Sequence, residues 1–265
     1  MSELLLPKYL DAIGAVDLSR VTAPGEIPDA FVLAREGKFA TCYIPFEAVN
    51  AAARVVIVGI TPGFNQWKNA VAEAKRQLQR GASAQELLHA SRLAGAFSGA
   101  IRPNLVALLD AIGVQRWLGI DSCATIFGDH AGMVQVTSVL RHAVFVNGKN
   151  YSGAPSMTRT AFLQKQMLEW FAPEAGQLRG AVFIPMGGTV GEGLDWLAAR
   201  GAIDPKRILH GLPHPSGANA ERVAYFLGRK DKATLSNNTN GDQLDATRAA
   251  LTAQMHVLIA SARRS

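Results

Sequence analysis

Two short segments of the sequence combine residue types that suit chemistry on a bound ligand. Residues 59–63 read Gly-Ile-Thr-Pro-Gly, and residues 214–216 read His-Pro-Ser. Glycine lets a ligand approach the backbone closely, and proline makes a loop rigid. Histidine donates a strong hydrogen bond near neutral pH, whether or not it is charged. The two segments therefore predict a site whose backbone and imidazole N–H groups donate to oxygen atoms of a ligand.

Each segment directly follows a predicted β-strand. Residues 54–59 form a continuous apolar run, which is typical of a strand buried on both faces of a parallel sheet. Residues 133–140 and 181–186 predict two more strands, and residues 207–210 a short fourth one. Strands alternate with helical patterns, so we expect a three-layer α/β/α sandwich with a mostly parallel central sheet. Ligands of such folds bind beyond the carboxyl ends of the strands.

Apolar spacing predicts the helices and the extent of the domain. Helices are expected at residues 3–20, at 68–93 with a break near Gly81, at 102–112, after the Gly187-Gly188 pair, and at 243–262. No linker divides the chain, so residues 1–265 should form a single domain with a core at about 50–228. The polar, Asn-rich residues 230–242 predict a mobile loop.

Composition narrows the functional classes. The 27 basic and 21 acidic residues give a net charge of +6, which suits an anionic partner but is also common among ordinary enzymes. Two cysteines, Cys42 and Cys123, are too few for a disulfide framework or a four-cysteine metal site, and the histidines lack metal-ligand spacing. We therefore expect no metal and no cofactor. No signal peptide or membrane span is recognisable, which predicts a cytoplasmic protein without a membrane partner.

The order and separation of the two segments resemble those of the uracil-DNA glycosylase superfamily. Its first motif is Gly-x-x-Pro-Gly after a strand, and its last is His-Pro-Ser, or close variants of these. Between them, residues 96–99 look like the family segment whose aromatic ring stacks on a flipped base, which points to Phe97. Residues 136–140 align with a strand end that carries a base-reading Asn in many members, which points to Ser138. Residues 184–188 look like a later strand and glycine turn. The resemblance covers roughly residues 50–228.

The resemblance implies a monofunctional glycosylase that flips a damaged base out of DNA and hydrolyses its N-glycosidic bond. Its partner would be DNA that contains uracil or another damaged base, and the protein would be a monomer, bacterial-type, cytoplasmic and nucleoid-associated. His214 would stabilise the departing base, and Thr61 would orient the attacking water. The base would contact Gly59, Ile60, Pro62, Gly63, Phe97 and Ser138; the DNA backbone or a wedge would involve Ser216, Gly217, Ala218, Asn219 and Arg222.

Two departures from the family pattern modify this expectation. Several branches place Asp or Asn where this chain has Thr61, which cannot act as a general base at neutral pH. Ser138 lacks the amide that would pair with uracil, which favours a broader range of bases. The iron-sulfur branch needs four cysteines and is excluded.

Three alternatives remain open from the residues alone. The protein could be a non-catalytic or product-retaining binder of damaged or abasic DNA, given the weak Thr61 position. It could be an α/β-hydrolase-like or nucleotide-binding enzyme, although neither Gly-x-Ser-x-Gly nor a Walker motif is present. Single residues could also be structural: His214 as a satisfied histidine, Phe97 as a core residue and Arg222 as a solvated surface cation.

Overall fold

A three-stranded parallel sheet lies at the centre of the protein. The computed structural model describes residues 4–95 and 101–262. The strand order is β4-β3-β7, formed by Val134–Ser138, Val55–Gly59 and Val182–Pro185. All three predicted strands at these places are confirmed, each shorter than predicted by one to three residues in total. The protein is therefore a mixed α/β protein with a parallel sheet.

The strand order places a ligand-binding edge at the carboxyl end of β3. Of these three strands β3 comes first in the chain, and its two parallel partners lie on opposite sides of it. A crevice opens beyond the carboxyl ends of strands where connections leave in opposite directions, and ligands of α/β proteins bind there. At this edge Gly59 of β3 is paired with Ser138 of β4.

The predicted fourth strand at residues 207–210 is wrong in extent. Pro205–Arg207 form a 3₁₀ turn, and only a single parallel bridge joins Ile208 to Phe183. The N–H of Leu209 donates to the carbonyl of Phe183 at 2.8 Å. Proline lacks an N–H and disfavours regular pairing, and residue 211 is a glycine with φ +99°, so the extended stretch stays very short.

A second sheet, which the sequence did not predict, flanks the parallel one. It is antiparallel with the order β1-β2-β5-β6. The strands β2 and β5 pair in regular antiparallel register, so segments about 100 residues apart in the chain lie side by side. The expectation of one mostly parallel sheet is thus corrected to two sheets of different kinds. The strand bounds are Val32–Glu36, Phe39–Cys42, Ala143–Val146 and Lys149–Asn150.

Helices pack on both faces of the parallel sheet. Alternate residues of a strand point to opposite faces, and in β3 the side chains of Val56 and Val58 join one core cluster while Val55 and Ile57 join another. The first cluster includes side chains of α6, α7 and α8, and the second those of α4, α5, α9 and α10. Their bounds are Ala161–Gln166, Ala172–Gln177, Gly188–Ala198, Ile101–Ile112, Val114–Leu118, Ala220–Phe226 and Gly241–Ala262.

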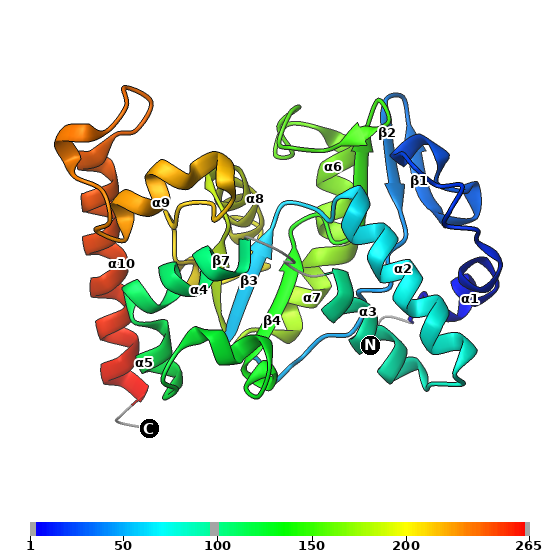
Figure 1. Ribbon diagram of the computed structural model, residues 1–265, viewed down its shortest axis with the longest axis horizontal. Coiled ribbons are helices and arrows are strands. Elements are labelled where there is room, and N and C mark those ends of the chain that lie inside the picture. The colour runs from blue at the N-terminus through cyan, green and yellow to red at the C-terminus, as the bar shows by residue number, and fades with distance from the viewer. Residues whose placement is uncertain (1–3, 96–100, 263–265) are drawn as a thin grey trace.

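A third cluster joins the antiparallel sheet to the first three helices, α1 (Leu6–Ala15), α2 (Phe64–Gln79) and α3 (Ala84–Gly95). Its centre is Trp67, which is fully buried and donates its indole N–H to the carbonyl of Tyr43 at 2.8 Å. In Figure 1 this part lies at one end of the molecule, α9 and α10 lie at the other, and the parallel sheet lies between them. The predicted break near Gly81 separates α2 from α3 as expected.

The polar segment 230–242, whose mobility stays a prediction, is hydrogen-bonded to α9. It contains a 3₁₀ turn at Lys232–Thr234 and is tied to Glu221 of α9. The Glu221 carboxylate accepts hydrogen bonds from Lys230, Ser236 and Thr239. These donors hold the pKa of Glu221 well below its usual range. The final helix α10 begins at Gly241, two residues before the predicted start.

Candidate functional site

The 59–63 segment forms the loop between β3 and α2, as the sequence predicts. The carbonyl oxygens of Gly59 and Ile60 accept hydrogen bonds from Val139 N at 2.9 Å and Leu140 N at 3.0 Å. These bonds continue the β3–β4 pairing beyond the strand ends, so Ser138 and the start of the loop lie at the same edge. Gly63 ends the loop as the N-cap residue of α2.

Thr61 joins the two sheets through its hydroxyl group. The side chain is 8% exposed. Its Oγ1 donates to the carbonyl of His142 at 2.9 Å and accepts from the N–H of Val144 at 3.0 Å. A threonine hydroxyl has one hydrogen to donate, and here it is donated to the backbone. Thr61 therefore has a structural role in fixing the loop against β5.

A carboxamide that the sequence analysis did not single out lies beside this loop. Asn150 of β6 accepts a hydrogen bond at Oδ1 from the N–H of Phe64, 2.9 Å away, in the first turn of α2. A Cβ placed on Gly63 would lie 3.6 Å from Asn150 Nδ2. Since Oδ1 binds the helix, the free Nδ2 group is a donor next to the loop. The Asn147-Gly148 pair, a type I′ turn signal, could have revealed this hairpin.

His214 is half-buried beside the glycine turn that follows β7. A Cβ placed on Gly187, whose φ is +99°, would lie 3.8 Å from the Cβ of His214. The backbone N–H of Ser216 donates to Nδ1 of the imidazole at 3.2 Å. An Nδ1 atom that accepts a hydrogen bond carries no proton, so the neutral ring has its hydrogen on Nε2. Burial lowers the pKa of His214, which favours this neutral form.

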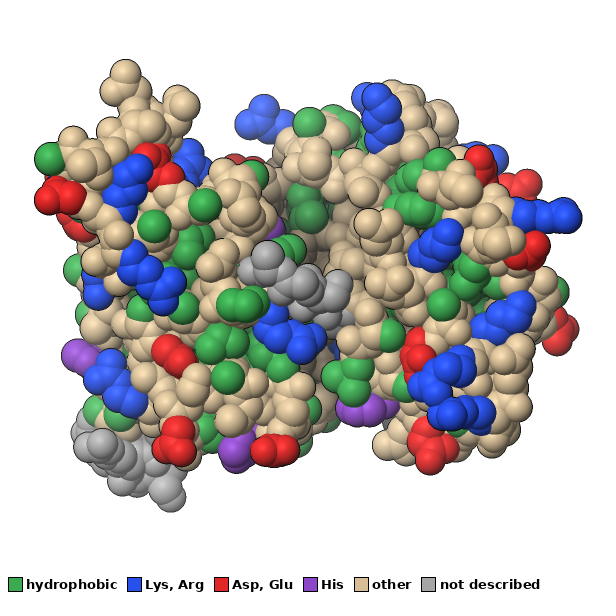
Figure 2. All heavy atoms as spheres, viewed as in Figure 1, with side chains coloured by type: hydrophobic (Ala, Val, Ile, Leu, Met, Phe, Trp, Pro, Cys, Tyr) green, Lys and Arg blue, Asp and Glu red, His purple; other side chains and the backbone are tan. Residues whose placement is uncertain are grey.

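The fold brings the two predicted segments to one edge. Met186 N donates to the carbonyl of Val58 at 2.9 Å, so the residues that follow them, Gly187 and Gly59, leave the sheet side by side. His214 lies against Gly187, and the 59–63 loop begins at Gly59. Figure 2 shows the surface hollowed between the two ends of the molecule, with Lys and Arg side chains spread over the face instead of gathered in one patch.

The predicted stacking residue, Phe97, lies outside the described residues. The helix that follows it, α4, is joined to the second segment because Asn104 Nδ2 donates to the carbonyl of Pro215 at 3.0 Å. The described chain thus resumes at Ile101, one helical turn before a residue that contacts the His-Pro-Ser loop.

The predicted DNA-contacting residues form a short turn after His214. Gly217–Asn219 make one 3₁₀ turn, which includes Ala218, and the Asn219 side chain donates to Ser216 Oγ at 3.1 Å. Arg222 lies on α9, where it donates to the carbonyl of Asn238 at 3.0 Å. The Arg222 guanidinium therefore binds the backbone of the 230–242 segment.

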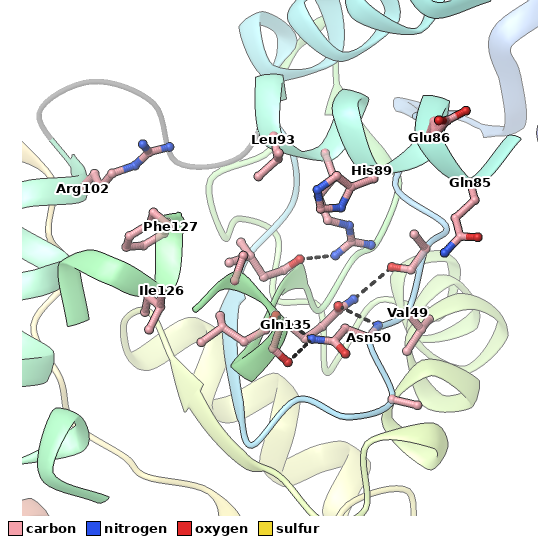
Figure 3. A pocket seen from close by; sticks show the side chains of 17 residues that line it. Val49, Asn50, Gln85, Glu86, His89, Leu93, Arg102, Ile126, Phe127 and Gln135 are labelled. Carbon is pink, nitrogen blue, oxygen red and sulfur yellow. Dashed lines mark hydrogen bonds between the residues drawn. The ribbon is translucent and has the colours of Figure 1, made fainter. Parts of the chain in front are cut away.

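A pocket of about 560 Å³ lies elsewhere, beside the first residues of the edge strand β4 (Figure 3). Its lining includes His89, Arg102, Phe127 and Gln135 but none of the predicted site residues that the structure describes. Within residues 4–95 and 101–262, no group of three or more His, Cys, Asp or Glu side chains is arranged to hold a metal ion. Over the same residues, no helix combines the length and apolarity needed to cross a membrane.

The fold and the site define a mixed α/β protein whose candidate site lies at the carboxyl edge of its parallel sheet. The chain is 34% identical over 217 residues to the uncharacterized protein YoxB of Bacillus subtilis (strain 168). The aligned residues are 81% of this chain and 85% of that protein. The chain therefore belongs to the same family as YoxB. No protein-family model matches the chain, and no solved structure matches it.

Proposed function

We propose that this protein is a DNA glycosylase of the uracil-DNA glycosylase type, with a three-layer α/β/α arrangement around its parallel sheet. It removes uracil, and other deaminated bases, from DNA and leaves an abasic site. The observation that carries the proposal is the meeting of two sequence-distant segments at one sheet edge. There a neutral imidazole lies against Gly187, which leaves the sheet beside Gly59, where the glycine-proline loop begins, and among the described residues Nε2 has no hydrogen-bond partner.

His214 would stabilise the departing base. Breaking the bond between C1′ of the deoxyribose and the base nitrogen leaves the bonding electron pair on the base, whose oxygen atoms gain negative charge. A neutral imidazole donates a hydrogen bond to such an oxygen without first losing or gaining a proton. The Ser216 N–H fixes the ring in the required tautomer, so Nε2–H is the group that faces the base.

Water would then attack C1′ after the base has begun to leave. Its oxygen forms the new bond to C1′, and one of its protons balances the charge of the departed base. Thr61 keeps its hydroxyl hydrogen on the carbonyl of His142, so it does not activate this water. The reaction therefore depends on stabilising the leaving group, and the role of Thr61 in orienting water passes to the backbone of the loop.

Asn150 would select bases that carry an oxygen, not an amino group, at position 4 of a pyrimidine or position 6 of a purine. Its Oδ1 is bound by the N–H of Phe64, which leaves Nδ2 as a hydrogen-bond donor beside Gly63. Such a donor pairs with the exocyclic oxygen of uracil, hypoxanthine or xanthine. It opposes the amino groups of cytosine and adenine, which are donors themselves. This geometry suits a preference for deaminated bases without requiring an amide at Ser138.

A base-release assay tests the proposal. Wild-type protein and the His214→Ala variant are incubated with labelled single- and double-stranded oligonucleotides that contain uracil, hypoxanthine or xanthine, and abasic sites are cleaved with alkali. We expect wild-type cleavage that falls by about 100- to 1,000-fold in His214→Ala, since one preorganised donor has effects of that size. Absence of cleavage of every substrate by folded wild-type protein would refute glycosylase activity.

A second candidate function is a binder that retains damaged or abasic DNA without releasing a base. The observation that favours it is the commitment of the Thr61 hydroxyl to the backbone, which leaves the loop without a polar side chain for water. Tight binding to abasic DNA together with no base release would support this function. Its affinity should fall steeply with salt, because phosphate contacts release counterions.

A further inference from the structure

The pocket beside β4 has a shape and a set of lining groups that the proposed reaction does not use. It lies between α3, the start of β4 and the loops at residues 48–51 and 126–132. Figure 3 shows Arg102 and Phe127 on one side of it and His89 and Leu93 on the other. Its volume of about 560 Å³ is in the range of small-molecule sites.

Positive charge prevails in the lining. Arg92 donates from its two terminal nitrogens to the carbonyls of Val136 and Phe46, and no carboxylate of the described residues accepts a hydrogen bond from it. Burial lowers the pKa of Arg92 to about 10. The carboxylate in the lining, Glu86, accepts hydrogen bonds from the N–H and the hydroxyl of Ser83 at 2.8 and 2.7 Å.

Arg102 provides a second cation and a flat surface. Its guanidinium carbon lies 4.8 Å from the ring centroid of Phe127. A guanidinium stacked on a ring in this way can bind a planar group on its other face and an anion at its edge. The apolar side chains of the lining include Val49, Leu93 and Ile126, and the polar ones include Gln85 and His89.

The amides at the base of the pocket are already satisfied. Gln135 donates to Glu174 at 2.7 Å and accepts from the N–H of Asn50 at 3.1 Å. The side chain of Asn50 donates to the carbonyl of Gly132 at 2.7 Å and accepts from Ala52 N at 3.2 Å. Recognition of a ligand therefore depends on the cations and on the apolar walls.

We propose that this pocket is a second ligand site, which binds a small organic anion: one phosphate or carboxylate group joined to a flat, apolar body. The anion would lie at the edge of the Arg102 guanidinium and in the field of Arg92. The flat body would lie between the Arg102–Phe127 stack and the side chains of Leu93 and His89. The proposal does not depend on the glycosylase reaction.

Calorimetric titration of the full chain tests the site with defined probes. Adenosine monophosphate, uridine monophosphate and 2-naphthoate carry both features, whereas adenosine lacks the charge and inorganic phosphate lacks the body. We expect saturable binding of the first three, at least about tenfold tighter than of the last two. No binding of any probe up to about 5 mM would overturn the proposal, as would equal affinity for adenosine and its monophosphate.

Paired variants assign the binding to this pocket. Arg102→Gln should weaken the binding of the charged probes by at least about tenfold. Arg179→Gln, the same change at an exposed arginine, should leave their binding unchanged. Gly132→Leu should fill part of the pocket, because Gly132 is in its lining, and it should fold, because a Cβ there meets nothing within 4 Å. Gly180→Leu is the control, since its surroundings are equally open and it lies outside the lining. Thermal unfolding shows that each variant is folded. Equal losses in a variant and its control would place the binding elsewhere.

Discussion

The backbone N–H of Ser216 donates a hydrogen bond to Nδ1 of His214, at 3.2 Å. Two residues that are next-but-one neighbours thus determine which ring nitrogen carries the proton. The loop that contains Pro215 thus holds the imidazole at Nδ1, and the proton lies on Nε2, which can donate it in a hydrogen bond. The family resemblance predicted the importance of His214, but the tautomer becomes evident only from this bond.

The first prediction concerns the titration of His214. Burial lowers its pKa, and the bond from Ser216 N–H is lost when Nδ1 becomes protonated. The imidazole should therefore stay neutral through pH 6.5 and gain its proton only at lower pH. Nitrogen-15 NMR of the rings should show the Nε2–H tautomer at pH 7. A His214 pKa above the ordinary value, or an Nδ1–H tautomer, would contradict the proposed role.

The second prediction separates structure from chemistry at Thr61. Thr61→Val leaves the carbonyl of His142 and the N–H of Val144 without their partner, which should lower the free energy of unfolding by about 2 kcal/mol or more. Base release per folded molecule should fall far less than in His214→Ala. Thr252→Val removes a hydroxyl that bonds only within α10 and is the control for urea unfolding. A loss of activity as large as in His214→Ala would restore a catalytic role to Thr61.

The third prediction concerns the choice of base by Asn150. Asn150→Asp keeps an acceptor for the N–H of Phe64 but replaces the Nδ2 donor with a carboxylate oxygen, which repels a base oxygen. We expect kcat/KM for uracil release to fall by about tenfold, the effect of losing one hydrogen bond. The same change at exposed Asn69 of α2 should have no effect. If wild-type protein releases uracil and Asn150→Asp does so equally well, Asn150 does not read the base.

The fourth prediction concerns stability in mild acid. Burial, with the charge of Arg141 beside it, lowers the pKa of His142 to about 3. The unfolded chain then binds more protons than the folded one between pH 6.5 and 3. Stability is complete above pH 6.5 and should fall by up to about 1.4 kcal/mol per pH unit as the pH decreases. In His142→Gln the slope from urea unfolding at several pH values should be shallower, whereas exposed His256→Gln should keep the wild-type slope. Identical slopes would show that His142 does not cause it.

The fifth prediction concerns the 230–242 segment. Glu221→Gln weakens the acceptor that Lys230, Ser236 and Thr239 share, so amides of this segment should exchange with deuterium faster. Amides of β3 should keep their wild-type rates, because Glu221 makes no bond to the parallel sheet in the described structure. Exposed Glu36→Gln is the control. Unchanged exchange in residues 230–242 would mean that packing, not Glu221, holds the segment.

The strands β3 and β7 were predictable from the sequence because each is a run of buried apolar residues. The strand β4 has valines at alternate positions, with polar residues between them. The helices α2 and α3 were predictable from the spacing of their apolar residues, and the break between them from Gly81. The antiparallel sheet was not predicted, because the pairing of β2 with β5 joins parts of the chain about 100 residues apart. The strand β6 has only two residues and so has no pattern of its own, and its partner determines it.

The candidate site was predictable only in part, for the same physical reason. The glycines, His214 and Ser138 were recognisable from their order along the chain. The partners of Thr61 are 81 and 83 residues away, and the partner of Asn150 is 86 residues away, so their roles depend on contacts that no local pattern contains. Hydrogen bonds between distant segments therefore account for what the sequence did not predict here.

The Thr61 hydroxyl, which bonds to β5, makes the loop at residues 59–63 dependent on the antiparallel sheet. Opening of that sheet would release the loop even while β3, β4 and β7 stay paired. On heating, the site would then inactivate in a partly unfolded state, at a lower temperature than that at which the parallel sheet melts. The thermal limit of the proposed activity would then be set by the antiparallel sheet, not by the more deeply buried parallel one.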